Sequence, residues 1–154
     1  MDSAKATIDE FAEWVTPHAP AMRQLAARLV GRTDGEDVVQ DSLIRAWRRR
    51  ETFDSERGTP RSWLLAIVAD QARHRRRRKP PAFSEAVDIS FEPDIDLERA
   101  IAHLADRQRL AVELHYFVGL GVKEAAQVMG CAEGTVKSTL ADARARLREW
   151  LGES

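Results

Sequence analysis

The sequence has little of what disulfide-linked, membrane-spanning or β-rich proteins need. Cys131 is the only cysteine among 154 residues, so no internal disulfide can form and a cysteine-based zinc site would need ligands from elsewhere. No apolar run approaches the ~18 residues that a membrane span requires, and the acidic start MDSAKATIDE does not resemble a signal peptide. Tyrosine occurs once, and alternating β-branched runs are absent. We therefore expect an all-α protein located in the cytoplasm.

Catalytic and metal-binding motifs are also missing. The four histidines show no H-x-x-x-H spacing, and the sequence contains no GxSxG, P-loop or GxGxxG motif. We therefore expect no catalytic residue, no metal and no cofactor. Glu36, Asp37 and Asp41 could act as paired carboxylates in acid–base chemistry, but their place at a helix start and along its exposed face favours a protein-binding surface.

What is present is a charge-rich chain with an uneven charge distribution. Hydrophobic residues make up 44% and charged residues 32%, which suits a helical protein with a modest core. Residues 1–79 carry 16 Lys and Arg against 12 Asp and Glu, residues 80–96 carry five acids and no cation, and residues 97–154 carry eight of each. The overall net charge of −1 therefore does not exclude nucleic-acid binding. The pattern predicts two small helical domains, 1–79 and 97–154, joined by an extended acidic linker at 80–96.

The first domain begins with two predicted helical stretches. Apolar residues recur at helical spacing over 8–29, where Pro17 and Pro20 predict two short helices or one kinked helix, and Gly31 ends the stretch. Asp34 is then placed to cap the next helix. The apolar stripe of that helix is Val39, Leu43, Ala46 and Trp47. Four residues lie largely off the stripe and predict an exposed surface: Asp37, Gln40, Asp41 and Ile44.

A third helix is predicted to begin at Thr59-Pro60, with the threonine hydroxyl as cap and proline at the first helical position. It runs into RHRRRRK at 73–79, which has six cations in seven residues. Two or three cations could simply cap a helix C-terminus, but six favour a phosphate-binding stripe.

Aromatic residues lie close to cations at the start of this helix. Phe53 and Arg57 belong to the preceding loop, and Arg61 and Trp63 belong to the first helical turn. Aromatic rings beside cations suit stacking on unpaired bases. For Trp63, a place in the hydrophobic core is an equally good interpretation.

The second domain contains the most informative pattern, VKEAAQVMGCAEGTVKSTLA at 122–141. Ala126 is small where two helices must nearly touch, Gly130 can adopt the left-handed conformation of a tight turn, and Val136 is apolar where the second helix must lock onto the first. This spacing predicts a helix-turn-helix, with residues 133–151 as the helix that enters a DNA major groove. An ordinary helical hairpin is the alternative, but it does not require all three positions at once.

Two blocks of the sequence resemble extracytoplasmic-function (ECF) RNA polymerase sigma factors of the sigma-seventy superfamily. DGEDVVQDSLIRAWRRRETFDSERGTPRSWLLAI at 34–67 is similar to their second conserved region, and LADRQRLAVELHYFVGLGVKEAAQVMGCAEGTVKSTLADARARLREW at 104–150 is similar to their fourth. Both blocks occur in the family's order with a linker of suitable length. The chain therefore looks like a minimal member with no added C-terminal domain.

The resemblance implies that the chain binds bacterial core RNA polymerase and directs promoter-specific initiation by recognising and melting promoter DNA. It implies no bond chemistry, because nucleotide addition belongs to the polymerase. Docking on core polymerase is expected at Asp37, Gln40, Asp41 and Ile44. Melted minus-ten DNA is expected at Phe53, Arg57, Arg61, Trp63, Arg73, Arg75, Arg76, Arg77 and Arg78. Double-stranded minus-thirty-five DNA is expected at Glu133, Thr135, Lys137, Ser138, Asp142 and Arg144.

The resemblance also implies roles outside these residues. The acidic linker matches the segment that threads through the polymerase toward its active site and RNA exit path. An anti-sigma factor that covers both DNA-binding domains is an expected partner, and membrane insertion is not expected.

Three positions depart from the family pattern. Thr139 and Asp142 stand where relatives commonly carry arginine, and Asp70 stands where they often carry asparagine. A carboxylate at 142 repels phosphate but can accept a hydrogen bond from cytosine N4. We therefore expect weak intrinsic DNA affinity or an atypical minus-thirty-five sequence.

Two other functions are compatible with parts of the sequence. A free-standing helix-turn-helix repressor or activator would explain residues 97–151, but it would leave the acid-edged helix at 34–47 without a purpose. An enzyme acting on nucleic acid could use Asp37 and Asp41 with a metal, and it would show metal-dependent cleavage. A sigma factor would instead comigrate with core polymerase and support run-off transcription from a promoter.

Overall fold

The computed structural model describes residues 7–78 and 95–152, which fold into helices without any strand. We call these two stretches the first half and the second half. The first half contains α1 (Ile8–Val15), η2 (Thr16–His18), α2 (Ala19–Val30), α3 (Arg32–Arg48), η3 (Arg50–Thr52) and α4 (Pro60–Arg78). The second half contains α6 (Ile95–Ala102), α7 (Asp106–Val112), the π-helical η5 (Glu113–Val118), α8 (Val122–Met129) and α9 (Glu133–Trp150). The all-α prediction is confirmed.

Proline and glycine set the early helix boundaries where the sequence predicts them. Pro17 lies in the short η2 turn and Pro20 lies in the first turn of α2, so two helices form rather than one. Gly31 ends α2 with a φ of 90°. The expectation that Asp34 caps the next helix is wrong, because α3 already begins at Arg32 and Asp34 is a buried residue inside it.

The first half is a tight bundle of α2, α3 and α4. Gly35 allows α2 and α3 to approach closely, since a Cβ there would lie 3.0 Å from the backbone nitrogen of Ala27. Thr59 caps α4 as predicted, with its hydroxyl accepting a hydrogen bond from the Ser62 amide at 2.9 Å. Fully buried side chains of the three helices form the core: Met22, Leu25, Leu29, Val38, Leu64, Leu65 and Val68.

The second half contains the predicted helix-turn-helix. Gly130 ends α8 in the left-handed conformation, with φ 66° and ψ 38°, and α9 begins at Glu133. Ala126 and Val136 are both buried, and they lie on the two helices that this turn joins. Before the helix-turn-helix, α6 ends at Ala102 and α7 begins at Asp106.

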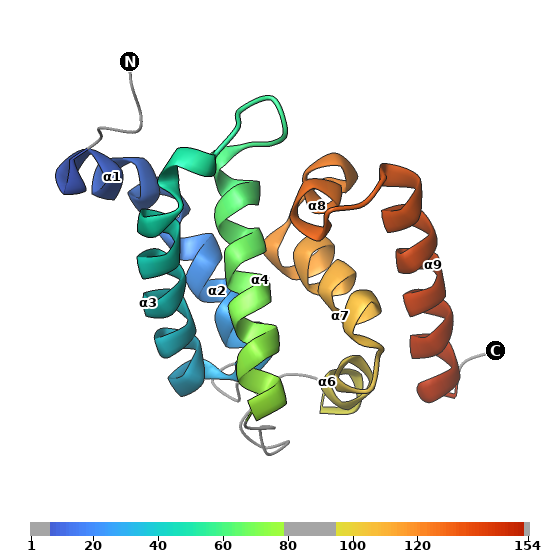
Figure 1. Ribbon diagram of the computed structural model, residues 1–154. Helices are drawn as coiled ribbons and strands as arrows, with labels where there is room; N and C mark the ends of the chain where they lie inside the picture. The colour runs from blue at the N-terminus through green and yellow to red at the C-terminus, as the bar shows by residue number, and fades with distance from the viewer. Residues whose placement is uncertain (1–6, 79–94, 153–154) are drawn as a thin grey trace.

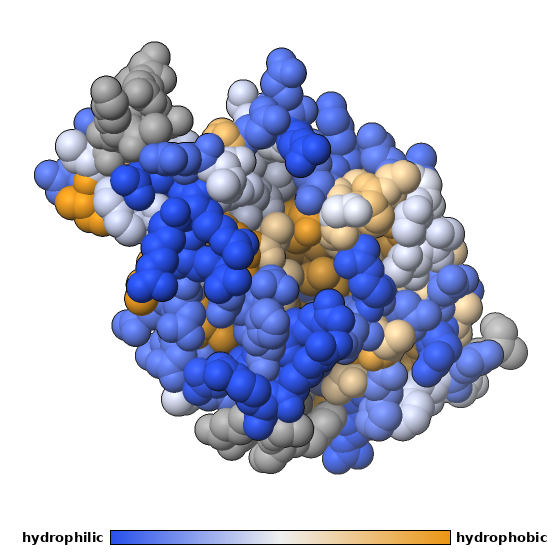
Figure 2. Space-filling model, viewed as in Figure 1, coloured by the Kyte–Doolittle hydropathy of each residue, from blue (hydrophilic) through white to orange (hydrophobic). Residues whose placement is uncertain are grey.

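The two halves lie against each other, and α4 occupies the middle of the molecule beside α8 (Figure 1). On the same face, apolar side chains gather at the centre while hydrophilic side chains cover α3 and the lower part of α4 (Figure 2). Most of the predicted linker falls outside the described residues, although α6 starts at Ile95, within its predicted range of 80–96. In the two described stretches, no helix is long and apolar enough to cross a membrane.

Candidate nucleic-acid interface

The helix α9 lies at the outer edge of the second half (Figure 1). Val136, Leu140 and Ala143 are buried against the other helices, as the helical spacing predicts. Ser138 and Asp142 are four residues apart and lie on the side of the helix opposite this buried stripe. All six residues that we expect at minus-thirty-five DNA are exposed: Glu133, Thr135, Lys137, Ser138, Asp142 and Arg144.

One of these side chains is held by a residue that the sequence did not single out. The Arg144 guanidinium donates a hydrogen bond to the hydroxyl of Tyr116, at 3.0 Å from Nη1 to the oxygen. Tyr116 belongs to η5 and is 52% exposed, which is unusual for an aromatic residue in an apolar helical segment. The contact connects the recognition helix to the body of the second half.

The predicted polymerase-docking residues form an exposed strip on α3. Asp37, Gln40 and Asp41 are exposed, and Ile44 is an apolar side chain with 52% of its surface in solvent. Asp41 and Ile44 line a shallow groove between α3 and α4. The other residues of this groove are Arg45, Arg48, Arg49 and Gln71. A charged groove around one exposed isoleucine is suited to binding another protein.

The loop before α4 brings the predicted aromatic residues together. The rings of Phe53 and Trp63 meet edge to face with centroids 5.8 Å apart, and both rings also contact Trp14. Trp63 is half-buried, so it serves the packing of this cluster while part of its ring stays accessible. Trp14 was missed at the sequence level, although it lies three residues after Phe11 on the apolar side of α1. Arg57 is exposed in the same loop.

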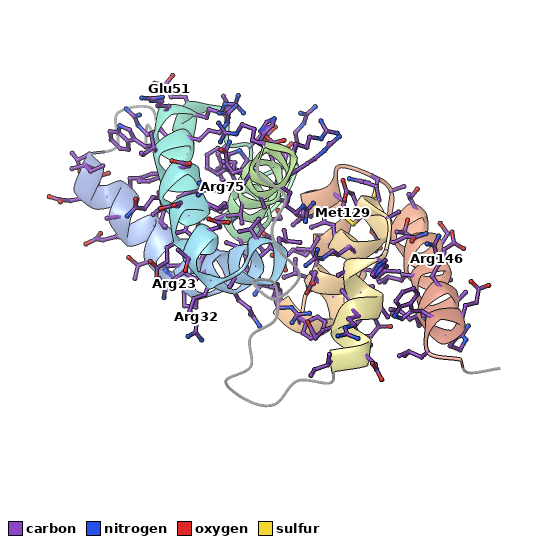
Figure 3. The ribbon with its side chains drawn as sticks, turned by 90° about the horizontal axis from the view of Figure 1, so that it is seen from below. Arg23, Arg32, Glu51, Arg75, Met129 and Arg146 are labelled. Carbon is purple, nitrogen blue, oxygen red and sulfur yellow. The ribbon has the colours of Figure 1, made fainter. Side chains whose placement is uncertain are left out.

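The arginine cluster at the end of α4 divides into two groups. Arg73, Arg77 and Arg78 are exposed. The Arg75 side chain instead lies between α3 and α4 (Figure 3), where its Nη2 donates to Asp34 at 2.9 Å and to Asp37 at 3.2 Å. Arg75 therefore has a structural role in the bundle, because it connects α4 to Asp34 and Asp37 of α3.

Arg76 points toward the second half. Its side chain is only 17% exposed, and its Nη2 lies 3.7 Å from the Asp106 carboxylate. It lines a cleft between α4 and the helices α7 and α8, together with Arg73 and Arg107. Burial lowers the pKa of Arg76, and the neighbouring Arg109 adds to this effect.

Arg61 also pairs with the second half. Its guanidinium donates two hydrogen bonds to the Glu124 carboxylate, one of them 2.9 Å from Nε to Oε2. The Thr59 hydroxyl donates to the same carboxylate at 2.9 Å. The hydrogen bonds from Arg61 lower the pKa of Glu124, and the carboxylate in turn raises the pKa of Arg61. Burial lowers the pKa of the nearby His18, and the charge of Arg61 lowers it further.

A second, buried ionic network also joins the two halves. Glu113 is 0% exposed and accepts hydrogen bonds from Arg28 at 2.7 and 3.3 Å, while Arg109 Nε lies 3.6 Å away. Arg28 also donates to Glu98 at 3.1 Å and stacks over the ring of Phe117. Burial raises the pKa of Glu113, and the adjacent Arg28 opposes that shift.

The sequence contained a signal for this network that we did not use. Leu110, Glu113 and Phe117 recur at helical spacing, so an acid occupies a place in a stripe that should be apolar. A buried acid at such a position requires a cationic partner. Neighbouring side-chain to backbone bonds add to the same interface: Gln24 to the Phe117 carbonyl at 2.9 Å, and Arg109 to the Arg28 carbonyl at 2.8 Å.

Other polar residues take structural positions. The His103 ring stacks on Trp150, and His115 Nδ1 lies 2.8 Å from the Leu120 carbonyl oxygen. Cys131 is half-buried beside the turn of the helix-turn-helix. Over residues 7–78 and 95–152, no three His, Cys, Asp or Glu side chains are grouped closely enough to hold a metal ion.

Family models match most of the chain. Residues 14–80 match sigma-70 region 2, and residues 94–147 match sigma-70 region 4. The first match covers the aromatic cluster and α4, and the second covers the helix-turn-helix. The two matches occur in the order that the sequence predicts.

Known proteins with these regions resemble the chain over most of its length. The ECF RNA polymerase sigma factor SigM of Mycobacterium tuberculosis is 37% identical over 137 residues, covering 82% of this chain and 69% of the relative. The RNA polymerase sigma-E factor of Streptomyces coelicolor is 31% identical over 156 residues, covering 92% and 86%.

Solved structures give the same result for the fold. The sigma factor RpoE of Bartonella quintana, in complex with the anti-sigma factor NepR, is 31% identical, with a TM-score of 0.71 and coverage of 94% of this chain and 98% of the other. The structure of CnrH in complex with the cytosolic domain of CnrY is 27% identical, with a TM-score of 0.77 and coverage of 97% and 92%.

Proposed function

The chain belongs to the ECF sigma factors of the sigma-70 family, and from this membership we propose how its surfaces divide the work of initiation. A sigma factor binds bacterial core RNA polymerase and directs it to promoters. The observation that carries this function is the presence of both sigma regions in order along one chain, at residues 14–80 and 94–147. A free-standing repressor would not need the first region.

Docking on core polymerase is the task of the exposed strip on α3. Asp37, Gln40 and Asp41 offer polar contacts, and Ile44 offers an apolar anchor at the edge of a groove. Exposed isoleucine within a charged surface favours a protein partner over nucleic acid, because acidic residues repel phosphate.

Capture of the melted minus-ten strand is the task of the aromatic cluster and α4. Opening a duplex costs ~1.4 kcal/mol per base step, so unpaired bases must be held as they appear. The accessible edges of Phe53 and Trp63 can stack on bases, and the cations Arg57, Arg73, Arg77 and Arg78 can contact the backbone. Arg61, Arg75 and Arg76 belong to the same site, although each pairs with carboxylates in this structure.

Recognition of the minus-thirty-five element is the task of α9. Its exposed polar side chains can enter a major groove, and Ser138 and Asp142 lie on the side of the helix opposite its buried stripe. The carboxylate of Asp142 can accept from cytosine N4.

The remaining assignments follow from the family. Residues 1–79 and 97–154 act as two domains with a linker at 80–96 that threads through the polymerase. The chain has no enzymatic activity of its own and acts in the cytoplasm, where its polymerase is. An anti-sigma factor is its regulatory partner, as it is for the RpoE relative of Bartonella quintana.

Reconstitution with purified core polymerase tests this function. The chain should comigrate with core polymerase on gel filtration and support run-off transcription from a selected promoter. Asp41→Lys together with Ile44→Asp should abolish comigration, whereas Glu13→Lys on the exposed side of α1 should not. Binding to an operator as a dimer without polymerase would support the repressor instead, and metal-dependent cleavage of DNA would support the enzyme.

A further inference from the structure

We propose that Tyr116 and Arg144 together bind one phosphate of the DNA backbone beside α9, with the tyrosine hydroxyl holding the guanidinium in position. Tyr116 belongs to η5 and is not among the residues that the sequence predicts at the DNA. The inference rests on the proposed function, because it takes α9 to be the helix that enters the major groove.

Three cations of α9 lie along one flank of the helix. Lys137, Arg144 and Arg148 are seven and four residues apart, and all three are exposed. Helical periodicity places this flank between the buried stripe and the side that carries Ser138 and Asp142. When the outer side of a helix faces base edges, its flanks face the phosphate backbones of the groove. The flank of Arg144 is therefore the place for phosphate contacts.

Tyr116 reaches this flank from a neighbouring element. The segment η5 is a π-helical turn over Glu113–Val118, and such turns are rare and often occur at functional sites. Glu113 and Leu114 in this turn are both 0% exposed, whereas Tyr116 is 52% exposed. The turn thus buries one side of η5 in the core and leaves the tyrosine at the surface beside α9.

The Tyr116 ring is held in place by its neighbour in sequence. The His115 ring meets it edge to face, with centroids 4.9 Å apart and an interplanar angle of 74°. His115 Nδ1 in turn lies 2.8 Å from the carbonyl oxygen of Leu120, a buried residue just before α8. A side chain that is already ordered loses little conformational freedom when it binds a ligand.

The hydroxyl of Tyr116 is suited to share a phosphate with Arg144. Its oxygen accepts a hydrogen bond from Arg144 Nη1 at 3.0 Å, which leaves the hydroxyl hydrogen to be donated. The hydroxyl is neutral, so it positions the guanidinium without cancelling the charge that attracts phosphate. A phosphate at this position can accept from the guanidinium and from the hydroxyl at the same time.

A pair of variants tests whether the two side chains act on the same phosphate. Tyr116→Phe removes the hydroxyl and keeps the ring, and it should weaken binding of the full chain by about fivefold at fixed salt. The probe is a short duplex selected for binding by the parent chain at low salt. In the Arg144→Gln background, Tyr116→Phe should cost less than about twofold, because the phosphate is no longer held there. The same loss in both backgrounds, or no loss in the parent, would overturn the proposal.

Arg146→Gln is the matched control for Arg144→Gln. It removes the same charge from the same helix, and Arg146 is exposed on the opposite flank. Tyr116→Phe should therefore weaken binding in the Arg146→Gln background by the same factor of about five as in the parent. A lower midpoint of urea unfolding for Tyr116→Phe, with equal losses of affinity in all three backgrounds, would assign the hydroxyl to stability and overturn the proposal.

The salt dependence separates failure of this inference from failure of the proposed function. Arg144→Gln should lower the slope of log affinity against log salt by about 1, because one phosphate contact by a cation is lost. No change of affinity or slope in Arg144→Gln would contradict both the phosphate contact and the position of this flank at the DNA. A lower slope in Arg144→Gln, with no effect of Tyr116→Phe on affinity, would refute the role of Tyr116 alone.

Discussion

The two long helices that are proposed to bind DNA occupy opposite environments in this molecule. Helix α4 runs through its middle, packed by α2 and α3 on one side and by α8 on the other (Figure 1). Helix α9 lies at its edge, with its proposed DNA-contacting residues exposed. Both helices carry cations, but Arg61 and Arg76 of α4 face carboxylates of the second half, whereas Arg144 of α9 contacts an uncharged tyrosine.

The two helices therefore differ less in how much charge they carry than in whether their cations are free of carboxylate partners. The run at 73–79 is far more basic than any part of α9, yet Arg75 and Arg76 within it are engaged by acids. The residues of α9 proposed for the minus-thirty-five element are exposed, whereas Arg61, Arg75 and Arg76 of α4 are paired with carboxylates.

The largest expected effect comes from breaking the buried ionic network of Arg28, Glu113 and Arg109 between the two halves. Arg28→Leu leaves the buried Glu113 without its main partner, and it should lower the free energy of unfolding in urea by about 3 kcal/mol. Arg23→Leu is the control, since Arg23 lies on the same helix, is exposed and points outward (Figure 3), and it should change stability by less than about 0.5 kcal/mol.

A double variant isolates the cause of that loss. Arg28→Leu with Glu113→Leu removes the unpaired carboxylate as well, so most of the lost stability should return. An equal loss in the single and double variants would mean that the ion pair is not the source.

The next effect concerns the accessible helix. Asp142→Arg replaces a charge that repels phosphate with one that attracts it, and the free chain should bind a minus-thirty-five duplex roughly tenfold more tightly at fixed salt. The slope of log affinity against log salt should steepen by about 1. Asp96→Arg makes the same charge change on α6 as a control, and a gain no larger than this control would contradict the position of Asp142 at the DNA.

A smaller effect compares two arginines of α4. In the free chain Arg77 is exposed and Arg61 is paired with Glu124, so Arg77→Gln should lower the salt slope for a random-sequence duplex by about 1 and Arg61→Gln should leave it unchanged. Filter binding over a salt series measures both slopes. An equal decrease of the salt slope in the two variants would show that Arg61 contacts DNA as readily as Arg77, and pairing with Glu124 would then not limit the binding of DNA by α4.

The smallest effect is a pH dependence of the Arg61–Glu124 pair. Because the pKa of Glu124 is lowered below its usual value of 4.5, the pair stabilises the contact between the two halves fully above pH 4.5, and this contribution is lost as the pH falls through the lowered pKa. The free energy of unfolding in urea should differ between the parent chain and Glu124→Gln by less than about 1 kcal/mol at pH 6. This difference should shrink as the pH falls below 4.5. A difference that grows with acidity would have the wrong sign.

Local physics made most of the helices predictable. Pro17, Gly31 and Gly130 act through their own backbone preferences, so they mark helix ends whatever surrounds them. The exposure of Asp37, Gln40, Asp41 and Ile44 followed from helical spacing, and the burial of Val136 followed from the helix-turn-helix pattern. Asp34 failed as a predicted cap because α3 begins two residues earlier, at Arg32, and the Asp34 carboxylate instead pairs with Arg75, distant in sequence.

The sequence by itself determined the all-α fold, the helix-turn-helix and the family, because each depends on short-range spacing that can be read along one chain. Only the tertiary structure decided which charges are available. Arg61 and Arg76 look like the other arginines of α4 in sequence, and their partners Glu124 and Asp106 come from helices 30 or more residues away. Pairing of charges depends on distance in space, and no local pattern encodes that distance.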